Sequence, residues 1–542
     1  MRWLRGKHSF AFGGEVRRFY NNNFALDTGM VVFPSISAFI NDQVGSFNIN
    51  LSNGASKILE PAFGLFAEDS YKLRPNFTLI LGLRYDYNNV LSDSQNRFVE
   101  FVPSSISLIQ VGTNGLSEPY NSDAKLFQPR VGFAWDPWGD GKTSVRAGYA
   151  ILADQPVTGI VLNMTLNPPF GDPLNVNSAQ VPTLSLLNAA TVAGPSGLAP
   201  TTIFHGFRDP YVQSYNLTLQ RQVTSTLGLQ AGYIGSKGTH LRLARNLNQP
   251  FIGQPVGGTD PPPSVPFPAL SATSPIRPGS KLGNITEIDS SGNSNYNALW
   301  VSASKRFASG LQFDASYTYS KSLDYNSLSS QGVVLEDSTN PRLNYGPSDF
   351  DARNRFVINA VYDLPFKGNR LVSGWEISGI SQAQSGNPLT VVMNTSGPTG
   401  NFTLRPDVTA PVQVGYAAAA STYGIQWIEN PTVLVSPSGP KDANGGFTYH
   451  FGNLGRNSII GPSFVNTDFS LIKRTKITER LNTEFRAEFF DIFNHPNFGN
   501  PNLRLPITGS PLGTFGVITS TRFSTGDFGS ARQIQLALKL EF

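Results

Sequence analysis

Acidic, histidine and serine side chains are the groups in this 542-residue sequence that could perform covalent or metal chemistry. Asp349 and Asp351 are separated by one residue and could pair as a general acid and base. We expect them instead to cap the end of an exposed loop and to pair with Arg353 or Arg355. The spacing therefore does not predict an acid–base site.

Other chemical motifs fail at defined positions. Residues 136–143 end like a phosphate-binding loop, but the motif requires glycine where this chain has Asp136. There is no cysteine, no Gly-x-Ser-x-Gly elbow and no His-x-x-x-His pair. The five histidines are scattered: His8, His205, His240, His450 and His495. We expect no catalytic residue, no cofactor and no metal site, and therefore a protein that is not an enzyme.

Alternation of apolar and polar residues is the dominant pattern of the chain. It is clearest at the C-terminus, where one parity is wholly apolar: Ile534, Leu536, Leu538, Leu540 and Phe542. Side chains of a strand alternate between faces, so this pattern predicts a strand with one apolar face. The same alternation recurs upstream, as in 78–87, 227–233, 311–320 and 483–489. We count about fourteen to sixteen such strands, many near the ~10 residues that a tilted membrane strand needs.

Connections between the predicted strands alternate in length. Short turns are expected near 74–76, 136–142, 224–226, 308–310, 367–369 and 475–479. Long insertions are expected at about 88–127, 154–210, 236–295, 321–352, 387–464 and 494–531. Consecutive antiparallel strands place alternate connections at opposite ends, as in outer-membrane barrels with short periplasmic turns and long extracellular loops. The sequence therefore predicts an all-β fold, a transmembrane antiparallel up-and-down β-barrel.

Composition agrees with this fold class. Charged residues are 14% of the chain, and 41 basic against 37 acidic residues leave a net charge of +4, which does not favour nucleic acid as a partner. The long insertions are rich in Pro, Gly, Ser and Asn, so we expect exposed loops that bury no core, and no second domain. Aromatic residues near strand ends predict interfacial girdles, with a soluble sandwich core as the alternative: Tyr85, Tyr87, Trp135, Tyr149, Tyr317, Tyr319, Tyr362 and Trp375.

Several segments resemble the barrel of TonB-dependent receptors of the Oar-like, acidobacterial type. The resemblance is carried, in chain order, by residues 127–149, 215–222, 232–240, 316–322, 346–351, 452–457 and 485–498. It covers most of the chain. It implies an outer-membrane location and a barrel of about 22 strands, plugged by an N-terminal domain and preceded by a regulatory-like β-domain.

The chain departs from that family at its start. Residues 1–10 contain no apolar segment typical of a signal peptide, and the sequence begins with barrel strands. We therefore interpret residues 1–542 as a single partial domain, the C-terminal portion of the barrel, without plug or signal peptide. An open sheet in lipid would leave two unpaired edges, so the chain either closes as a smaller barrel or does not work alone.

Two groups of residues are assigned roles on this basis. Leu538, Leu540 and Phe542 resemble the C-terminal assembly signal of outer-membrane barrels, which implies the barrel assembly machinery and outer-membrane lipid as partners. Glu484, Arg486 and Glu488 share the face opposite Phe485, and a lipid-facing charge at mid-bilayer costs about 2–4 kcal/mol, so these charges should face the lumen. There they would contact a plug or line a passage; a ladder of opposite charges across neighbouring strands is the alternative.

The resemblance implies a receptor that captures a large or scarce solute, whose identity the sequence does not reveal. Uptake would be energised by the inner-membrane TonB complex, provided that an upstream plug exists. Loops 154–210, 236–295 and 387–464 are the expected sites of ligand contact. Two alternatives are an energy-independent channel and a surface adhesion or assembly scaffold.

Overall fold

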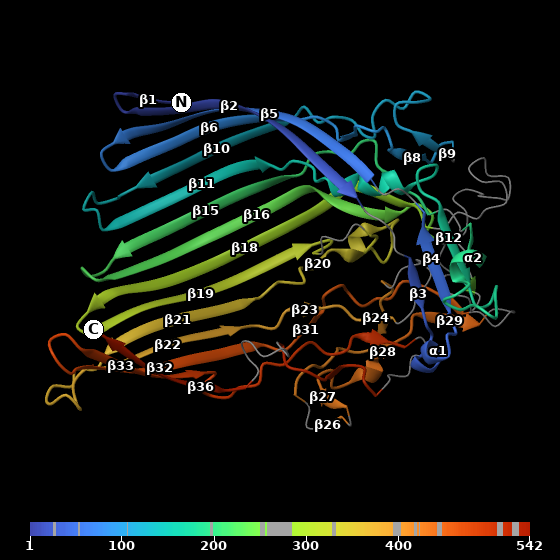
Figure 1. Cartoon of the computed structure of the whole chain (residues 1–542). Helices are drawn as coiled ribbons and strands as arrows, with labels where there is room; N and C mark the ends of the chain where they lie inside the picture. Colours follow the sequence, from blue (N-terminus) through green and yellow to red (C-terminus); the bar gives the residue numbers. More distant parts are fainter. Residues whose placement is uncertain are drawn as a thin grey trace.

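The computed structural model describes residues 1–542 except 25–28, 52–54, 106, 196–198, 250–254, 257–283, 328–331, 394–402, 417–419, 422, 442–446, 507–512 and 523–530. One large, mainly antiparallel sheet of 18 strands dominates the described part of the chain (Figure 1). The α-helices are short: α1 (Ile36–Ile40) and α2 (Ala189–Val192). Among the described residues, no helix has the length and apolar character needed to cross a membrane.

The large sheet is a meander in which each long strand pairs with the next one along the chain. In chain order its strands are β1 (Arg2–Arg5), β2 (His8–Phe24), β5 (Ala55–Arg74), β6 (Phe77–Asn88), β10 (Leu126–Trp135), β11 (Thr143–Ala153), β15 (Tyr211–Gln222), β16 (Leu227–Asn246), β18 (Thr286–Ala308), β19 (Leu311–Asp324), β21 (Asn354–Asp363), β22 (Trp375–Gln384), β32 (Phe464–Lys476), β33 (Asn482–Phe490) and β36 (Gln533–Glu541). Short additions are β7 (Ser92–Asp93), β14 (Thr201–Ile203) and β20 (Gly346–Pro347). Without these additions, the sheet has the fourteen to sixteen strands that the sequence predicts.

Register explains why the sheet has two chemically different faces. Leu217 pairs with Tyr233, Tyr233 with Leu299, and Leu299 with Tyr319, so four strands place a continuous apolar row on one face. All four side chains are exposed. A neighbouring row on the opposite face is polar, and consists of Gln220, Gln230, Ser302 and Ser316. The alternation read from the sequence is therefore the alternation of an apolar and a polar face.

Short turns gather at one end of the sheet and long connections at the other (Figure 1). The β18–β19 turn is only Ser309 and Gly310, both with positive φ (54° and 79°), the backbone conformation that a two-residue hairpin requires. In Figure 1 this end lies on the left, and the connections on the right carry small sheets of their own. The predicted order of short turns and long insertions is confirmed.

The long connections bury hydrophobic cores, contrary to the expectation from their composition. One cluster lies in the connections after β22 and β33 and includes Met393, Leu404, Ile428, Leu454 and Phe515. A second cluster gathers around Ile160, Met164 and Phe207, and a third around Val44 and Phe47. The expectation was wrong because sparse apolar residues from connections far apart in sequence meet in space, which composition does not reveal. We call this layer of packed connections the cap.

The cap contains small sheets in addition to its cores. Their strands are β3 (Met30–Val32), β4 (Ser46–Asn50), β8 (Val99–Val102), β9 (Ser107–Gln110), β12 (Pro173–Asn177), β13 (Gly194–Pro195), β17 (Pro255–Val256), β23 (Pro388–Leu389), β24 (Val392–Met393), β25 (Asp407–Val408), β26 (Ala420–Ser421), β27 (Gly424–Gln426), β28 (Leu434–Val435), β29 (Ser438–Lys441), β30 (Phe447–Tyr449), β31 (Ile459–Ile460), β34 (Arg504–Leu505) and β35 (Val517–Ile518). Some join different connections, as β24 does with β34. The connections are thus tied together by backbone hydrogen bonds as well as by apolar contacts.

Two boundaries differ from the sequence prediction. β16 continues to Asn246 and β18 begins at Thr286, so much of the predicted loop 236–295 is strand. Glycines and serines there weaken the apolar alternation, although the backbone ladder continues through register shifts near Leu241. A further long connection, between β2 and β5, was also missed, and it contains α1 and β4.

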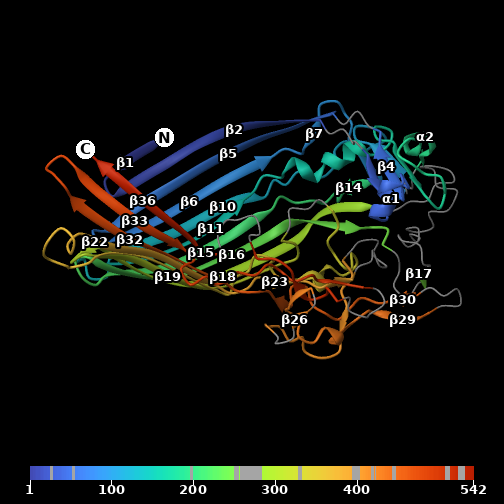
Figure 2. The same cartoon turned by 60° about the horizontal axis from the view of Figure 1, so that its bottom comes forward.

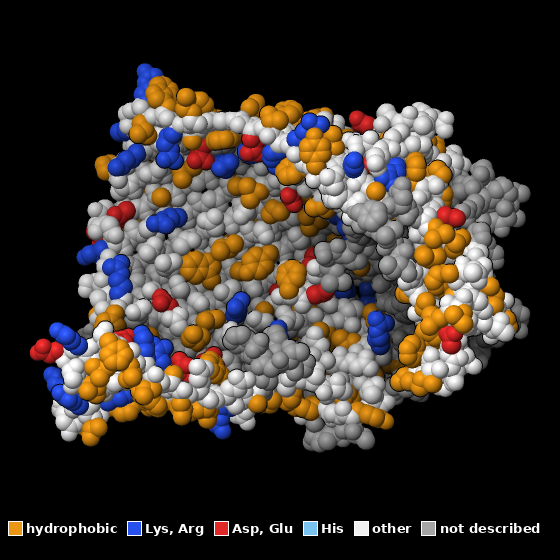
Figure 3. Space-filling model, viewed as in Figure 1, with side chains coloured by type: hydrophobic (Ala, Val, Ile, Leu, Met, Phe, Trp, Pro, Cys, Tyr) orange, Lys and Arg blue, Asp and Glu red, His pale blue; other side chains and the backbone are white. Residues whose placement is uncertain are grey.

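The sheet is strongly curved, and its two outer strands are β1 and β36 (Figures 1 and 2). Among the described residues, β1 pairs with β2 and β36 pairs with β33, and no pairing joins β1 to β36. Figure 3 shows that the curvature hollows one face of the sheet.

We expect the apolar face of the sheet to tolerate a charged side chain much less well than the polar face. Leu299→Arg places a cation on the apolar face and, if that face lies against hydrocarbon, should lower the free energy of unfolding by about 2–4 kcal/mol. Thr318→Arg, on the opposite face at a neighbouring register position, is the matched control and should change stability little. Denaturant unfolding in lipid vesicles measures both, and equal losses would contradict the assignment of the faces.

Candidate functional site

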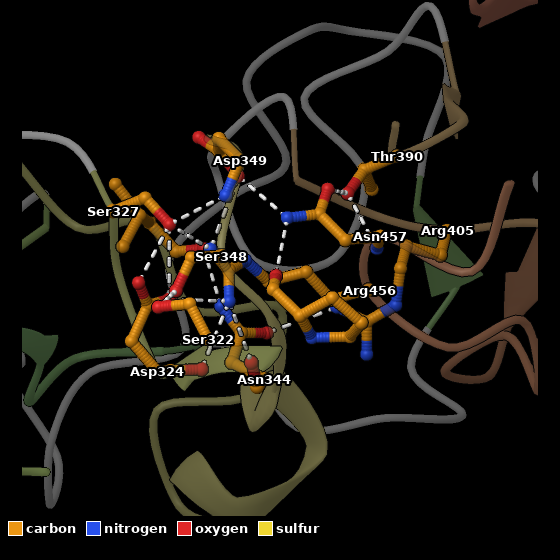
Figure 4. A network of polar contacts seen from close by, with 12 residues as sticks. Ser322, Asp324, Ser327, Asn344, Ser348, Asp349, Thr390, Arg405, Arg456 and Asn457 are labelled. Carbon is orange, nitrogen blue, oxygen red and sulfur yellow. Dashed lines mark hydrogen bonds and ion pairs between the residues drawn. The ribbon is translucent and has the colours of Figure 1, made fainter. Parts of the chain in front are cut away.

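A polar network joins two long connections of the cap, one between β19 and β21 and one between β22 and β32 (Figure 4). Arg456 is at its centre. One guanidinium nitrogen, Nη1, donates to the carbonyl oxygen of Asp324 (2.9 Å) and lies 2.8 Å from Asp324 Oδ1. The other, Nη2, donates to Ser327 Oγ (2.8 Å) and to Asp349 Oδ1 (3.1 Å). The guanidinium thus joins the connection after β22 to the connection after β19.

Asn457 continues the network from the next position of the chain. Its Nδ2 donates to the carbonyl oxygen of Pro347 (2.7 Å) and to Asp349 Oδ1 (2.6 Å). Thr390 Oγ1 donates to Asn457 Oδ1 (2.6 Å), which ties in the start of the same connection. Asn457 has a φ of 54°, a left-handed conformation that asparagine tolerates better than most residues. The Asn457 side chain therefore links its own segment to two others, one at Pro347 and Asp349 and one at Thr390.

A buried ion pair forms the second centre of the network. Arg405 and Glu336 are 3% and 0% exposed. The guanidinium of Arg405 contacts the Glu336 carboxylate, donates through Nε to the carbonyl oxygen of Leu454 (2.8 Å) and donates through Nη1 to Asn344 Oδ1 (2.9 Å). Burial raises the pKa of Glu336, and the positive charge of Arg405 acts in the opposite sense. Removing one partner of such a pair leaves a buried charge uncompensated, which destabilises strongly.

Several of these residues line a cavity of about 470 Å³ between the connections. Its walls include Asn344, Asp349, Thr390, Arg405 and Arg456, with Asn500 contributed by the connection after β33. Amide, hydroxyl, carboxylate and guanidinium groups thus converge on one space together with a few apolar side chains. A cavity with this lining is suited to binding a solute through hydrogen bonds.

Asp349 and Asp351, which the sequence analysis considered as an acid–base pair, have different partners in the structure. Asp351 Oδ1 accepts a hydrogen bond from the backbone N–H of Ser322 (2.8 Å), and Asp351 lies 3.7 Å from Arg353, as expected. Asp349 pairs with Arg456 instead of Arg353 or Arg355. Among the described residues, no group of three or more His, Asp or Glu side chains is placed to hold a metal ion.

The charges Glu484, Arg486 and Glu488 lie on the polar face of β33 and form part of a cross-strand ladder. Arg474 of β32 donates to Glu484 (2.8 Å), and Glu376 of β22 accepts from the same guanidinium. Arg486 donates to the other oxygen of Glu484 (2.5 Å) and lies 4.0 Å from Glu488. Opposite charges therefore neutralise one another along this part of the sheet, which is the ladder that the sequence left as an alternative.

Residues of the expected assembly signal lie on the apolar face of the last strand. Leu538 and Leu540 are 68% and 51% exposed, and Phe542 is 93% exposed just after β36. Leu538 pairs in register with Phe485 of β33, on the face opposite the charges. Their role in assembly stays a prediction.

Of the loops expected to contact ligand, 387–464 contributes most to the cavity described above. Loop 154–210 packs in the cluster around Ile160 and Met164. Residues 250–254 and 257–283 of the loop 236–295 lie outside the described residues.

The chain matches a known family over nearly its whole length. The family is described as outer membrane beta barrel domain, and the match covers residues 1–535. This chain belongs to the outer membrane beta barrel domain family. The outer-membrane location follows from that membership, and the antiparallel sheet described above agrees with it.

Solved structures similar to this chain include outer-membrane transporters and an import receptor. The outer membrane transporter YddB from Escherichia coli has 13% identity and a TM-score of 0.50, with 100% of this chain and 52% of that chain covered. The FrpB iron transporter from Neisseria meningitidis (F3-3 variant) has 13% identity and a TM-score of 0.43, with 99% of this chain and 53% of that chain covered. The ferric-catecholate import receptor Fiu from E. coli K12 has 12% identity and a TM-score of 0.44, with 100% of this chain and 53% of that chain covered. The chain spans about half the length of these structures, and no curated protein matches its sequence.

Two segments of the polar network were identified from the sequence, but it was not predicted that they are in contact. Residues 346–351 and 452–457 both carried the family resemblance, and the structure brings them together: a Cβ on Gly346 would lie 2.7 Å from the carbonyl oxygen of Arg456. Glycine at 346 therefore permits the close approach of the two segments. Arg405 belonged to no motif, and its isolated charge in a long connection gave no indication of burial.

Arg456→Gln tests whether the network holds the cap together. Loss of the guanidinium leaves the buried Asp324 uncompensated, so local opening of 341–351 and 452–459 should become easier by about 3–5 kcal/mol. Hydrogen exchange of these segments measures the change. Arg342→Gln removes an exposed arginine from the same connection and should leave exchange unchanged; equal effects of the two variants would contradict the role of Arg456.

A buried carboxyl in another part of the cap makes its stability depend on pH. Glu100 of β8 is 6% exposed, and burial, followed by repulsion from Glu287, raises the pKa of Glu100 to about 8. The folded state thus holds a proton that the unfolded chain releases near its ordinary value of 4.5, so stability falls as pH rises from about 4.5 to about 8.

Glu100→Gln keeps the size of the side chain and removes this titration. It should raise the free energy of local opening of β8 and β9 at pH 8 by about 1–3 kcal/mol relative to the native chain. At pH 5 this free energy should not change. Hydrogen exchange of residues 99–110 at the two pH values measures this difference. A gain that is independent of pH would show that the titration of Glu100 is not its cause.

Proposed function

We propose that this chain is the barrel part of a TonB-dependent outer-membrane receptor of the Oar-like type. In this proposal it captures a large or scarce solute at the cap and passes it along the polar face of the sheet. The observation that carries the proposal is the cavity of about 470 Å³ among cap connections, located at one end of a sheet with an apolar and a polar face. The fold likeness to a transporter supports the same function.

Residues 1–542 would then form a partial barrel domain that further strands, a plug and an export signal complete in the whole receptor. Two observations support this part of the proposal: β1 and β36 are not paired with each other in the described part of the chain, and the chain spans 52% of the YddB transporter. Unpaired strand edges are unfavourable in lipid, because backbone groups there have no water to bind. In the complete barrel of about 22 strands, these edges would pair with the additional strands.

The site residues take their roles within this arrangement. Glu484, Arg486 and Glu488 would face the lumen, where Arg474 and Arg486 neutralise part of the carboxylate charge. Leu538, Leu540 and Phe542 would present the assembly signal to the barrel assembly machinery. The inner-membrane TonB complex would be a partner through the plug.

The mass and conductance of the native protein test the proposal. An antibody against residues 531–542 should detect, in outer-membrane fractions, a band much heavier than 58.8 kDa. The purified native protein should carry no steady current in planar bilayers, because a plugged receptor opens only when energised. A 58.8 kDa band with steady conductance would replace the receptor by an energy-independent channel. A 58.8 kDa band without conductance would favour an adhesion or assembly scaffold.

A further inference from the structure

A second cavity lies on the polar face at the opposite end of the sheet from the cap. It has a volume of about 400 Å³ and is bordered by the start of β11, the turn between β15 and β16, and the end of β18. Lys142, Arg146 and Arg306 are the charged side chains that line it, and all three are exposed. In Figure 3, Lys and Arg side chains lie along the left margin of the hollowed face, where the short turns are.

Several other cations on this face lie beside an acid, on the same strand or one strand beyond the neighbouring strand. Arg84 of β6 lies 2.7 Å from both Glu15 and Asp86. Arg130 of β10 lies 3.2 Å from Glu68 of β5. The ladder around Glu484 shows the same balance. Neutralisation by a nearby acid is therefore common on the polar face.

The three cations of the cavity depart from this arrangement. Within the described part of the chain, no carboxylate lies within 4.0 Å of Lys142, Arg146 or Arg306, and no carboxylate lines the cavity. Asp140, in the adjacent turn, is 3.7 Å from Arg221, which also lies over the ring of Trp138. The positive charge in the cavity thus remains without an internal counterion.

Neutral groups complete the lining with hydrogen-bond donors. Ser144, Gln220, Gln230 and Ser302 occupy one row across four strands, and Arg146 Nε donates to Ser144 Oγ (3.1 Å). Amide and hydroxyl groups can turn to donate to an anion, and guanidinium groups bind phosphate oxygens in pairs. The chemistry of the lining is that of an oxyanion site.

We propose that this cavity binds a free anion of the phosphate type that carries two or more negative charges. Three cations around one space of this size suit a ligand with several charged oxygens better than a single chloride ion. The cavity is on the polar face, so the ligand is a solute and not the headgroup of a surrounding lipid. This binding does not depend on the receptor function proposed above, because it requires only the folded sheet.

One acidic residue near the cavity provides an independent control of the electrostatics. Asp314 of β19 pairs in register with Ser304, which lines the cavity. Its carboxylate is exposed and forms no ion pair in the described part of the chain. It should therefore repel an anion in the cavity, and Asp314→Asn should strengthen binding.

Calorimetric titration of the full chain in detergent micelles with inorganic pyrophosphate tests the site. The variant K142Q/R146Q/R306Q should bind at least about tenfold more weakly, and binding to the native chain should weaken as ionic strength rises. The matched control K367Q/R370Q/R480Q removes the same charge from other short turns at the same end and should keep the native affinity. Circular dichroism confirms that each variant retains its sheet.

Asp314→Asn should bind pyrophosphate a few-fold more tightly than the native chain, and this result does not depend on whether the triple variant folds. The proposal is overturned if native and triple-variant chains bind equally, or if the control variant loses as much affinity as the triple variant. It is also overturned if chloride binds as tightly as pyrophosphate at equal ionic strength, or if Asp314→Asn weakens binding.

Discussion

The structure depends on one constraint, the pairing of backbone N–H and C=O groups between neighbouring long strands. In lipid no water replaces a missing partner, so the strands must form a continuous antiparallel ladder. Pairing each strand with the next one in sequence achieves this with the shortest connections, and it forces alternate connections to opposite ends. The separation of short turns from the cap is a consequence of this pairing, as is the separation of the apolar face from the polar one.

The cap solves a different problem, which is to order long connections that have little regular structure. It uses small hydrophobic cores, such as the one around Leu404 and Ile428, and a few arginines with several partners each. Arg456 and Arg405 are effective there because a planar guanidinium with five N–H donors can satisfy carbonyl and carboxylate oxygens from separate segments. The cavity between the connections exists because these contacts hold its walls apart in a defined arrangement.

The polar face is not uniform in charge, although the chain as a whole is nearly neutral. Around Glu484 and Arg474, opposite charges alternate across strands and cancel. Around Arg146, the paired positions are Ala134 and Thr218, and the rest of the cavity lining beside Arg146 and Arg306 carries no carboxylate, so the field of the cations extends into the cavity. The difference arises from register, because register determines which residue of one strand lies beside a given residue of the next.

The sequence by itself determined the strands, their two faces and the order of the connections, because alternation and turn residues are local properties. Leu538 and Leu540, for example, are assigned to the apolar face by parity alone. Residue types also placed Glu484, Arg486 and Glu488 on one face. The pairing of Glu484 with Arg474 could be identified only from the register of β32 and β33. Only the tertiary structure decided the cores of the cap, the meeting of 346–351 with 452–457, the burial of Arg405 and the unpaired charges of Lys142, Arg146 and Arg306. These features depend on contacts between residues tens to hundreds of positions apart, and no local pattern encodes which distant segments will meet.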